Sequence, residues 1–157
     1  MRRGVMGTGI LIGALMLSGC SGGENTGSSN VRAAADDDPK ISAAFAKAKE
    51  TLPFFLSRWK TMKSDGVSLK FALKNAKGGE EYIWFTPDKI ANGEVIATCA
   101  NKPEDVKGLM LGDTRTFKTS EIKDWMIMVG RKCYGGYTSR ALIPPGEDPG
   151  VTFVDPE

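Results

Sequence analysis

The sequence contains no histidine and only three cysteines among its 157 residues. Without histidine, Ser-His and Cys-His nucleophile pairs are excluded, as are most transition-metal sites. Cys99 and Cys133 are too few for a structural zinc site, and they do not form a Cys-x-x-Cys redox motif. We therefore expect neither a metal ion nor a cofactor, and binding rather than catalysis.

An excess of one charge is also lacking. The whole chain carries 21 Lys and Arg against 19 Asp and Glu. Arg2 and Arg3 lie in an N-terminal segment that reads as a cleaved signal, and their loss would leave 19 charges of each sign. No long basic run is present. Because nucleic-acid binding depends on a positively charged footprint, we expect no nucleic-acid partner.

The one long apolar run lies at the N-terminus. After Arg2 and Arg3, the stretch "GVMGTGILIGALML" is shorter than the roughly 20 residues of a transmembrane helix and predicts a signal peptide. The "LSGC" motif that ends at Cys20 resembles the bacterial lipobox, whose cysteine is acylated. We predict a signal peptide at 1–19 and a membrane anchor on Cys20; an ordinary signal with an incidental cysteine is the alternative.

Localisation follows from the same motif. The residue after Cys20 is serine rather than aspartate, and by resemblance to sorted lipoproteins this favours the periplasmic side of the outer membrane. The lipidated cysteine and the Gly-, Ser- and Asp-rich stretch up to residue 39 predict a flexible tether. Residues 40–157 are long enough for a single domain with one modest core, followed by an irregular C-terminal tail.

The domain begins with a helical pattern. Apolar residues recur at three- and four-residue steps from Ile41 to Trp59, which predicts an amphipathic helix. Pro53 interrupts this pattern, and Thr51 is suited to capping a second segment, so a kink or two short helices are expected. Its aromatic stripe could serve a partner or a membrane, but core packing is favoured because strands that need a cover follow at once.

After Asp65-Gly66 the period changes from helical to alternating. In "VSLKFALK", Val67, Leu69, Phe71 and Leu73 form the apolar face opposite the polar one, as in a half-buried strand. An Asn92-Gly93 hairpin is expected between two further strands. Further strands are expected at 114–119, 121–129 and 134–143. The order predicts an α+β fold with about five or six antiparallel strands in a curled sheet, open or barrel-like, covered by the helix.

Several segments also resemble a known family. "TLPFF", "YIWF", "NGEVIATCANKPEDV", "LGD", "IKDWMIM" and "YGGYTSR" occur in this order in the YegJ-like family of bacterial proteins, domain of unknown function 2314. The resemblance covers roughly residues 41–143. The family usually has Asn-Asp-Pro where this chain has Asn101-Lys102-Pro103. The resemblance implies the domain and its boundaries, permits an immunity-like role against a toxin, and implies no chemistry.

A cluster near the C-terminus carries the candidate site. We predict that Asp124 and Arg140 pair across neighbouring strands, as structural partners or as ligand-binding groups. Trp125 should point to the opposite face and join the core. Gly135-Gly136 predicts a bend, a bulge or room for an aromatic ring rather than a phosphate loop. A pocket joining Asp124, Arg140 and Tyr137 would favour a small carboxylate-dependent hydrolase.

Cys99 and Cys133 have two readings. An exported domain can pair them in a disulfide, because both lie near the ends of predicted elements. Alternatively, each is a small core residue. Taken together, the sequence predicts an envelope lipoprotein that is anchored through Cys20 and binds another envelope protein or a ligand, with addition of a partner strand to its sheet as one mode.

Overall fold

The structure, a computed structural model, describes residues 38–156. The predicted signal peptide, Cys20 and nearly all of the predicted tether lie outside these residues. The described elements, in chain order, are α1 (Pro39–Arg58), β1 (Gly66–Lys74), β2 (Glu80–Ala91), β3 (Glu94–Cys99), β4 (Thr114–Lys118), the 3₁₀ turn η1 (Thr119–Glu121), β5 (Ile122–Val129), β6 (Lys132–Gly135), α2 (Tyr137–Ala141) and β7 (Thr152–Val154).

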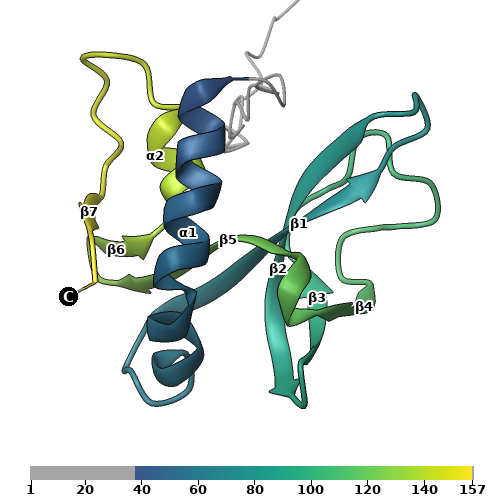
Figure 1. The fold of residues 1–157 in the computed structure, drawn as a ribbon, viewed down its shortest axis with the longest axis horizontal. Helices are drawn as coiled ribbons and strands as arrows, with labels where there is room; N and C mark the ends of the chain where they lie inside the picture. Colours follow the sequence, from purple (N-terminus) through teal and green to yellow (C-terminus); the bar gives the residue numbers. More distant parts are fainter. Residues whose placement is uncertain (1–37, 157) are drawn as a thin grey trace, which may run out of the picture. The chain divides into compact units, whose positions relative to one another are not determined.

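The strands form one sheet in the order β4-β3-β2-β1-β5-β6-β7. Every neighbouring pair is antiparallel except β6 and β7, which run parallel. The predicted α+β fold with a curled antiparallel sheet and a covering helix is confirmed (Figure 1). The described sheet has seven strands rather than five or six. It remains open, with β4 and β7 at its edges, so the barrel-like alternative is not adopted.

The predicted Asn92-Gly93 hairpin joins β2 to β3. Both residues have positive φ angles, 51° and 78°. A two-residue turn of this kind needs left-handed backbone at both positions, which Asn and Gly adopt with the least strain. The turn fixes the register of β2 against β3 and places the core residue Val95 opposite Ile90.

Helix α1 begins at a proline and is capped by the residue before it. The Asp38 side chain accepts a hydrogen bond of 2.8 Å from the backbone N–H of Lys40. One helix then continues through Pro53, so the prediction of two short helices is wrong. Thr51 does not cap a second segment, because its hydroxyl donates to the Lys47 carbonyl at 2.8 Å. Tertiary packing of the helix face outweighs the cost of the proline.

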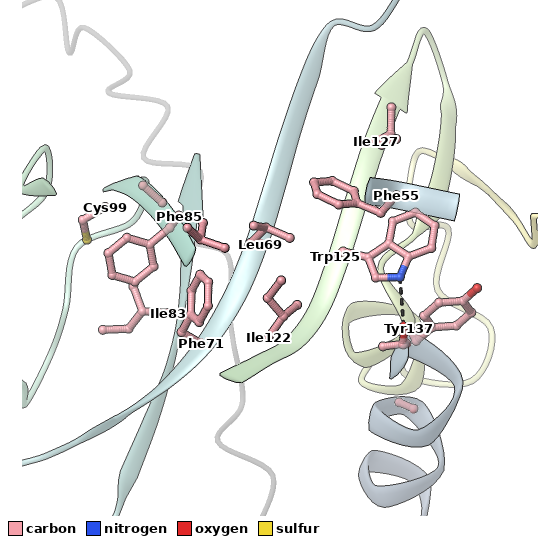
Figure 2. Close-up of a cluster of buried hydrophobic side chains, with 14 of the residues drawn as sticks. Phe55, Leu69, Phe71, Ile83, Phe85, Cys99, Ile122, Trp125, Ile127 and Tyr137 are labelled. Carbon is pink, nitrogen blue, oxygen red and sulfur yellow. Dashed lines mark hydrogen bonds between the residues drawn. The ribbon is translucent and has the colours of Figure 1, made fainter. Parts of the chain in front are cut away.

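The core lies between α1 and the apolar face of the sheet (Figure 2). Trp125 and Ile127 are fully buried, as predicted for the face opposite Asp124. The Trp125 indole N–H donates to the carbonyl of Ala48 at 3.1 Å, and its ring lies 5.6 Å from that of Phe55. Burying one such aromatic ring is worth up to about 4–6 kcal/mol of hydrophobic free energy. These contacts hold α1 on β5.

The predicted final strand at 134–143 is wrong beyond residue 135. Strand β6 ends at Gly135, and the chain then enters α2. Gly135 and Gly136 both have positive φ angles, 75° and 64°, and together they turn the chain out of the sheet. A Cβ atom on Gly135 would lie 2.3 Å from the Trp125 carbonyl oxygen and 2.7 Å from its indole Cε3. The predicted bend and the predicted room for an aromatic ring are both observed.

The C-terminal tail is also more ordered than predicted. It contains β7, which pairs with β6 in the register Lys132 to Thr152, Cys133 to Phe153 and Tyr134 to Val154. The tail returns along β6 and brings Asp155 beside α1 and α2. Among residues 38–156, no helix is both long and apolar enough to cross a membrane.

Gly135→Ala should destabilise the domain far more than Gly130→Ala. Both glycines have positive φ, so each substitution costs about 1 kcal/mol of backbone strain. Only the Gly135 methyl group would collide with backbone and indole atoms, whereas nothing lies within 4 Å of the Gly130 position. We expect a total loss of roughly 3 kcal/mol or more for Gly135→Ala, measured by urea denaturation. Equal losses in the two variants would contradict the close packing against Trp125.

Candidate functional site

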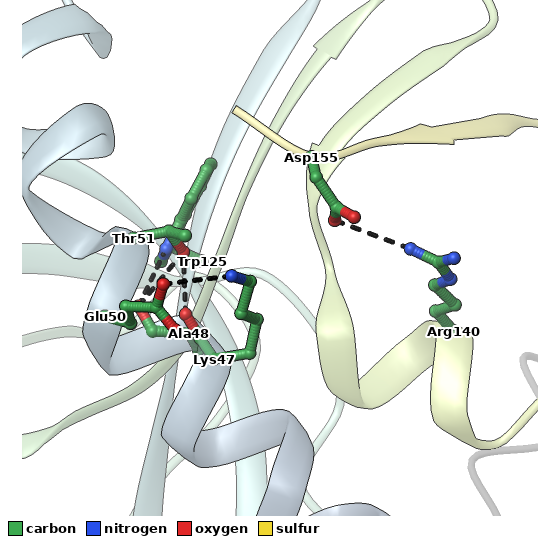
Figure 3. Close-up of polar contacts among 7 residues, drawn as sticks. All are labelled: Lys47, Ala48, Glu50, Thr51, Trp125, Arg140 and Asp155. Carbon is green, nitrogen blue, oxygen red and sulfur yellow. Dashed lines mark hydrogen bonds and ion pairs between the residues drawn. The ribbon is translucent and has the colours of Figure 1, made fainter. Parts of the chain in front are cut away.

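The predicted pairing of Asp124 with Arg140 is wrong. Arg140 lies on α2, not on a strand, and its side chain is about half exposed. Its guanidinium contacts the carboxylate of Asp155 at 3.5 Å (Figure 3). Asp124 is fully buried and is bound by other groups. The error arises at Gly136, where the chain turns from β6 into a helix and Arg140 is carried away from Asp124.

Asp124 instead holds the start of α2. Its carboxylate accepts hydrogen bonds from the backbone N–H groups of Trp125 at 2.8 Å, Tyr137 at 3.3 Å and Thr138 at 2.8 Å. The Thr138 hydroxyl donates a fourth, at 2.6 Å. The bonds from the Tyr137 and Thr138 N–H groups satisfy donors that the first turn of a helix leaves without intrahelical partners. One carboxylate thus joins β5 to α2.

Lys70 completes this buried network. Its ammonium donates to the Thr138 hydroxyl oxygen at 2.7 Å and lies 4.4 Å from the centre of the Trp84 ring. Lys70 is opposite Asp124 in the register of β1 with β5 and is only 3% exposed. The alternating pattern of β1 predicted a solvent-facing lysine, and that expectation is wrong. Only the pairing of β1 with β5 could have identified Lys70 as a buried residue, and this pairing cannot be read from the sequence pattern.

Burial governs both charges in this network, which we call the Lys70–Thr138–Asp124 network. Burial lowers the pKa of Lys70 from 10.5 to about 8, and the negative charge of Asp124 opposes this shift. Burial likewise raises the pKa of Asp124 above its ordinary value, against the effect of the Thr138 hydrogen bonds and of Lys70. Attraction and hydrogen bonding therefore offset part of the desolvation of each group.

The same arrangement has the order of an activated hydroxyl, with Thr138 between an amine and a carboxylate. A nucleophile must meet its substrate, however, and the three side chains of the network are each 3% exposed or less. Neither of the two cavities described below is lined by any of them. The network therefore acts as an internal support that fixes β1, β5 and α2 together.

Two further carboxylates, those of Glu81 and Glu121, also serve the fold. Glu81 accepts hydrogen bonds from the backbone N–H groups of Glu104 and Asp105, at 2.8 and 2.9 Å. Glu121 accepts one from the backbone of Lys118 at 2.6 Å. Across residues 38–156, no three His, Cys, Asp or Glu side chains are grouped closely enough to hold a metal ion.

The disulfide reading of Cys99 and Cys133 is wrong. Cys99 ends β3 and Cys133 lies on β6, with β2, β1 and β5 between them in the sheet. Four strand spacings correspond to roughly 19 Å, whereas a disulfide needs Cα atoms within about 7 Å. Both thiols are free and buried, as in the core-packing alternative. Burial raises the pKa of Cys133 to about 11.

Two cavities lie between α1 and the C-terminal part of the chain. The aromatic cavity, about 450 Å³, is lined by Phe54, Arg58, Met62, Tyr134, Val154, Asp155 and Pro156. The basic pocket, about 360 Å³, is lined by Lys40, Ala44, Lys47, Tyr137, Arg140, Ala141 and Asp155. Tyr137 and Arg140 of the predicted cluster therefore share a pocket, from which Asp124 is absent.

Lys70 should make the stability of the domain depend on alkaline pH. Its pKa is lower in the folded state, so its contribution to the free energy of unfolding is smallest below about pH 8 and is recovered as the pH rises towards 10.5. The gain should approach about 3 kcal/mol. Urea denaturation of the wild type and of Lys70→Met across this window isolates the effect. A difference between the two proteins that does not change with pH would contradict it.

Two comparisons with known proteins point to the same family for this chain. Residues 38–144 match the family described as "Uncharacterized protein conserved in bacteria (DUF2314)". The chain is 29% identical over 107 residues to "Uncharacterized protein YegJ" of Escherichia coli (strain K12), which covers 68% of this chain and 69% of that protein. No solved structure matches. The predicted resemblance is confirmed, and the chain belongs to the YegJ-like DUF2314 family of bacterial proteins.

Proposed function

We propose that this chain is an envelope lipoprotein, anchored through Cys20 on the periplasmic side of the outer membrane, whose domain binds another envelope protein at the β4 edge of its sheet. The "LSGC" motif after an apolar run supports the anchor. The observation that carries the binding role is the open β4 edge with two exposed apolar side chains directly before it.

Strand β4 is suited to pairing with another strand. It has β3 on one side and no described strand on the other, so its outer backbone groups before Lys118 are open to a partner, whereas the Lys118 N–H is bonded to Glu121. Phe117 fixes it to the core, because its ring stacks on Phe71 at 3.8 Å and lies 4.9 Å from Phe85. Outward-facing Thr114, Thr116 and Lys118 are exposed. A firmly held edge needs little reordering to accept a partner strand.

The loop before β4 supplies the apolar contact. Met110 is 69% exposed and Leu111 is 61% exposed, while the preceding Leu109 is buried. The backbone at Met110 is held in a tight turn, because its N–H donates a hydrogen bond to the Asp113 carboxylate at 2.8 Å. Adjacent large apolar side chains held in water are typical of contact residues. No specific observation favours the hydrolase or the immunity-like alternative over this role.

If Cys20 carries the lipid anchor, the substitution Cys20→Ala should prevent acylation, and the protein should be released from the membrane or processed incorrectly. The thiol is the group that would carry the acyl chain, and alanine has none. Metabolic labelling with a fatty-acid analogue, followed by membrane fractionation, tests this. Cys99→Ala serves as the control, because Cys99 is a buried core thiol and its loss should leave labelling unchanged. Equal labelling of the wild type and Cys20→Ala would refute the anchor.

The β4 edge predicts a position-dependent crosslink. A photoreactive amino acid at Thr116 should capture one discrete protein in intact cells, whereas the same group at Lys49, exposed on α1, should not. Adding Met110→Ser and Leu111→Ser should weaken the Thr116 crosslink severalfold without unfolding the domain, since both side chains are already in water. Leu56→Ser, another exposed apolar residue, is the matched control. Capture of the same protein from Lys49 would reject this edge as the site.

A further inference from the structure

The basic pocket has the composition of an anion site. Lys40, Ala44 and Lys47 recur at four- and three-residue steps and so share one face of α1, while Arg140 comes from α2. The alanine between the two lysines is small and leaves space in the middle of the pocket. The two helices therefore bring three cations to one cavity of about 360 Å³.

The cations of the pocket are only partly neutralised. Asp155 is the one carboxylate in its lining, so three positive charges face one negative charge. Arg140 contacts Asp155 at 3.5 Å through a single nitrogen, a longer contact than a bidentate pair would make (Figure 3). Lys47 lies 3.0 Å from Glu50, but their side chains are 44% and 68% exposed, so solvent screens part of this attraction. Among the described residues, no carboxylate forms an ion pair with Lys40.

Tyr137 contributes to the pocket with its residue surface rather than with its hydroxyl. The residue is 6% exposed, and its hydroxyl oxygen is buried. Burial raises the pKa of Tyr137, and the neighbouring Thr51 side chain opposes this shift. The ring packs against Trp125 with its hydroxyl pointing away from the indole (Figure 2). The groups that can meet an anion in the pocket are therefore its three cations.

We propose that the basic pocket binds a phosphate group, with Arg140 and the two lysines facing its oxygens. The lining carries a net excess of two positive charges, which matches a phosphate monoester dianion better than a single carboxylate. On binding, Arg140 exchanges its long contact with Asp155 for the phosphate. This site is separate from the β4 edge and does not depend on it.

The test is a titration of the full chain carrying Cys20→Ala with inorganic phosphate, followed by NMR or calorimetry. Arg140→Gln should weaken binding by about tenfold or more, since it removes charge-assisted hydrogen bonds. Tyr137→Phe should leave binding within about twofold of the parent, because the buried hydroxyl does not meet the phosphate. Asp155→Asn should strengthen binding, because it removes the competing carboxylate.

Matched controls separate a built site from general attraction. Arg58→Gln removes the same charge from the aromatic cavity, and Tyr134→Phe removes a hydroxyl there. Both should leave phosphate affinity within about twofold of the parent, because screened charges outside the pocket contribute little. If Arg58→Gln weakens binding as much as Arg140→Gln, or if the parent shows no saturable binding to any phosphate probe, the proposal is overturned.

A second arm identifies the source of the phosphate. Vesicles of phosphatidic acid in phosphatidylcholine are compared with phosphatidylcholine vesicles alone, using the parent and Arg140→Gln. Arg140-dependent binding to the phosphatidic acid vesicles but not to inorganic phosphate assigns a lipid headgroup. Arg140-dependent binding of inorganic phosphate assigns a soluble phosphate. Absence of both overturns the proposal.

Discussion

The arrangement of the C-terminal half depends on how one buried carboxylate is satisfied. Asp124 has no access to water, so its oxygens must find donors inside the protein. It finds them in the backbone at the start of α2 and in the Thr138 hydroxyl, which Lys70 then engages from β1. A five-residue helix has little stability of its own, so this anchoring decides where α2 lies.

The position of α2 in turn creates the basic pocket. Tyr137 and Thr138 are consecutive, and Thr138 faces Asp124 while the Tyr137 ring packs on Trp125. Arg140, two residues further along the helix, is directed to the surface beside α1 and Asp155. The buried network and the pocket are therefore two sides of the same short helix. A change that loosens the network would displace the pocket without touching any residue that lines it.

Local chemistry predicted much of the fold. The alternating strands, the Asn92-Gly93 turn and the burial of Trp125 follow from periodicity and backbone preference, and the structure has them all. The errors lie where a residue's partner is distant in sequence. The burial of Lys70 depends on the pairing of its strand with the strand that carries Asp124, 54 positions further along the chain. The distance that keeps Cys99 and Cys133 apart depends on the order of the strands in the sheet. Likewise, Gly135 and Gly136 within the predicted strand at 134–143 did not show whether the chain would bend inside the sheet or leave it.

Strand order also separates the two surfaces to which we assign binding. The β4 edge lies at one end of the sheet, and α2 is joined to β6 near the other, with β3, β2, β1 and β5 between the two ends. Five strand spacings correspond to roughly 24 Å, so a strand added to β4 does not cover the basic pocket. Coupling between the surfaces would require an element that both ligands shift between two arrangements, whereas the described residues between them form one continuous buried core. A protein partner at β4 and a phosphate at α2 should therefore bind independently, and the affinity for each should not change when the other is present.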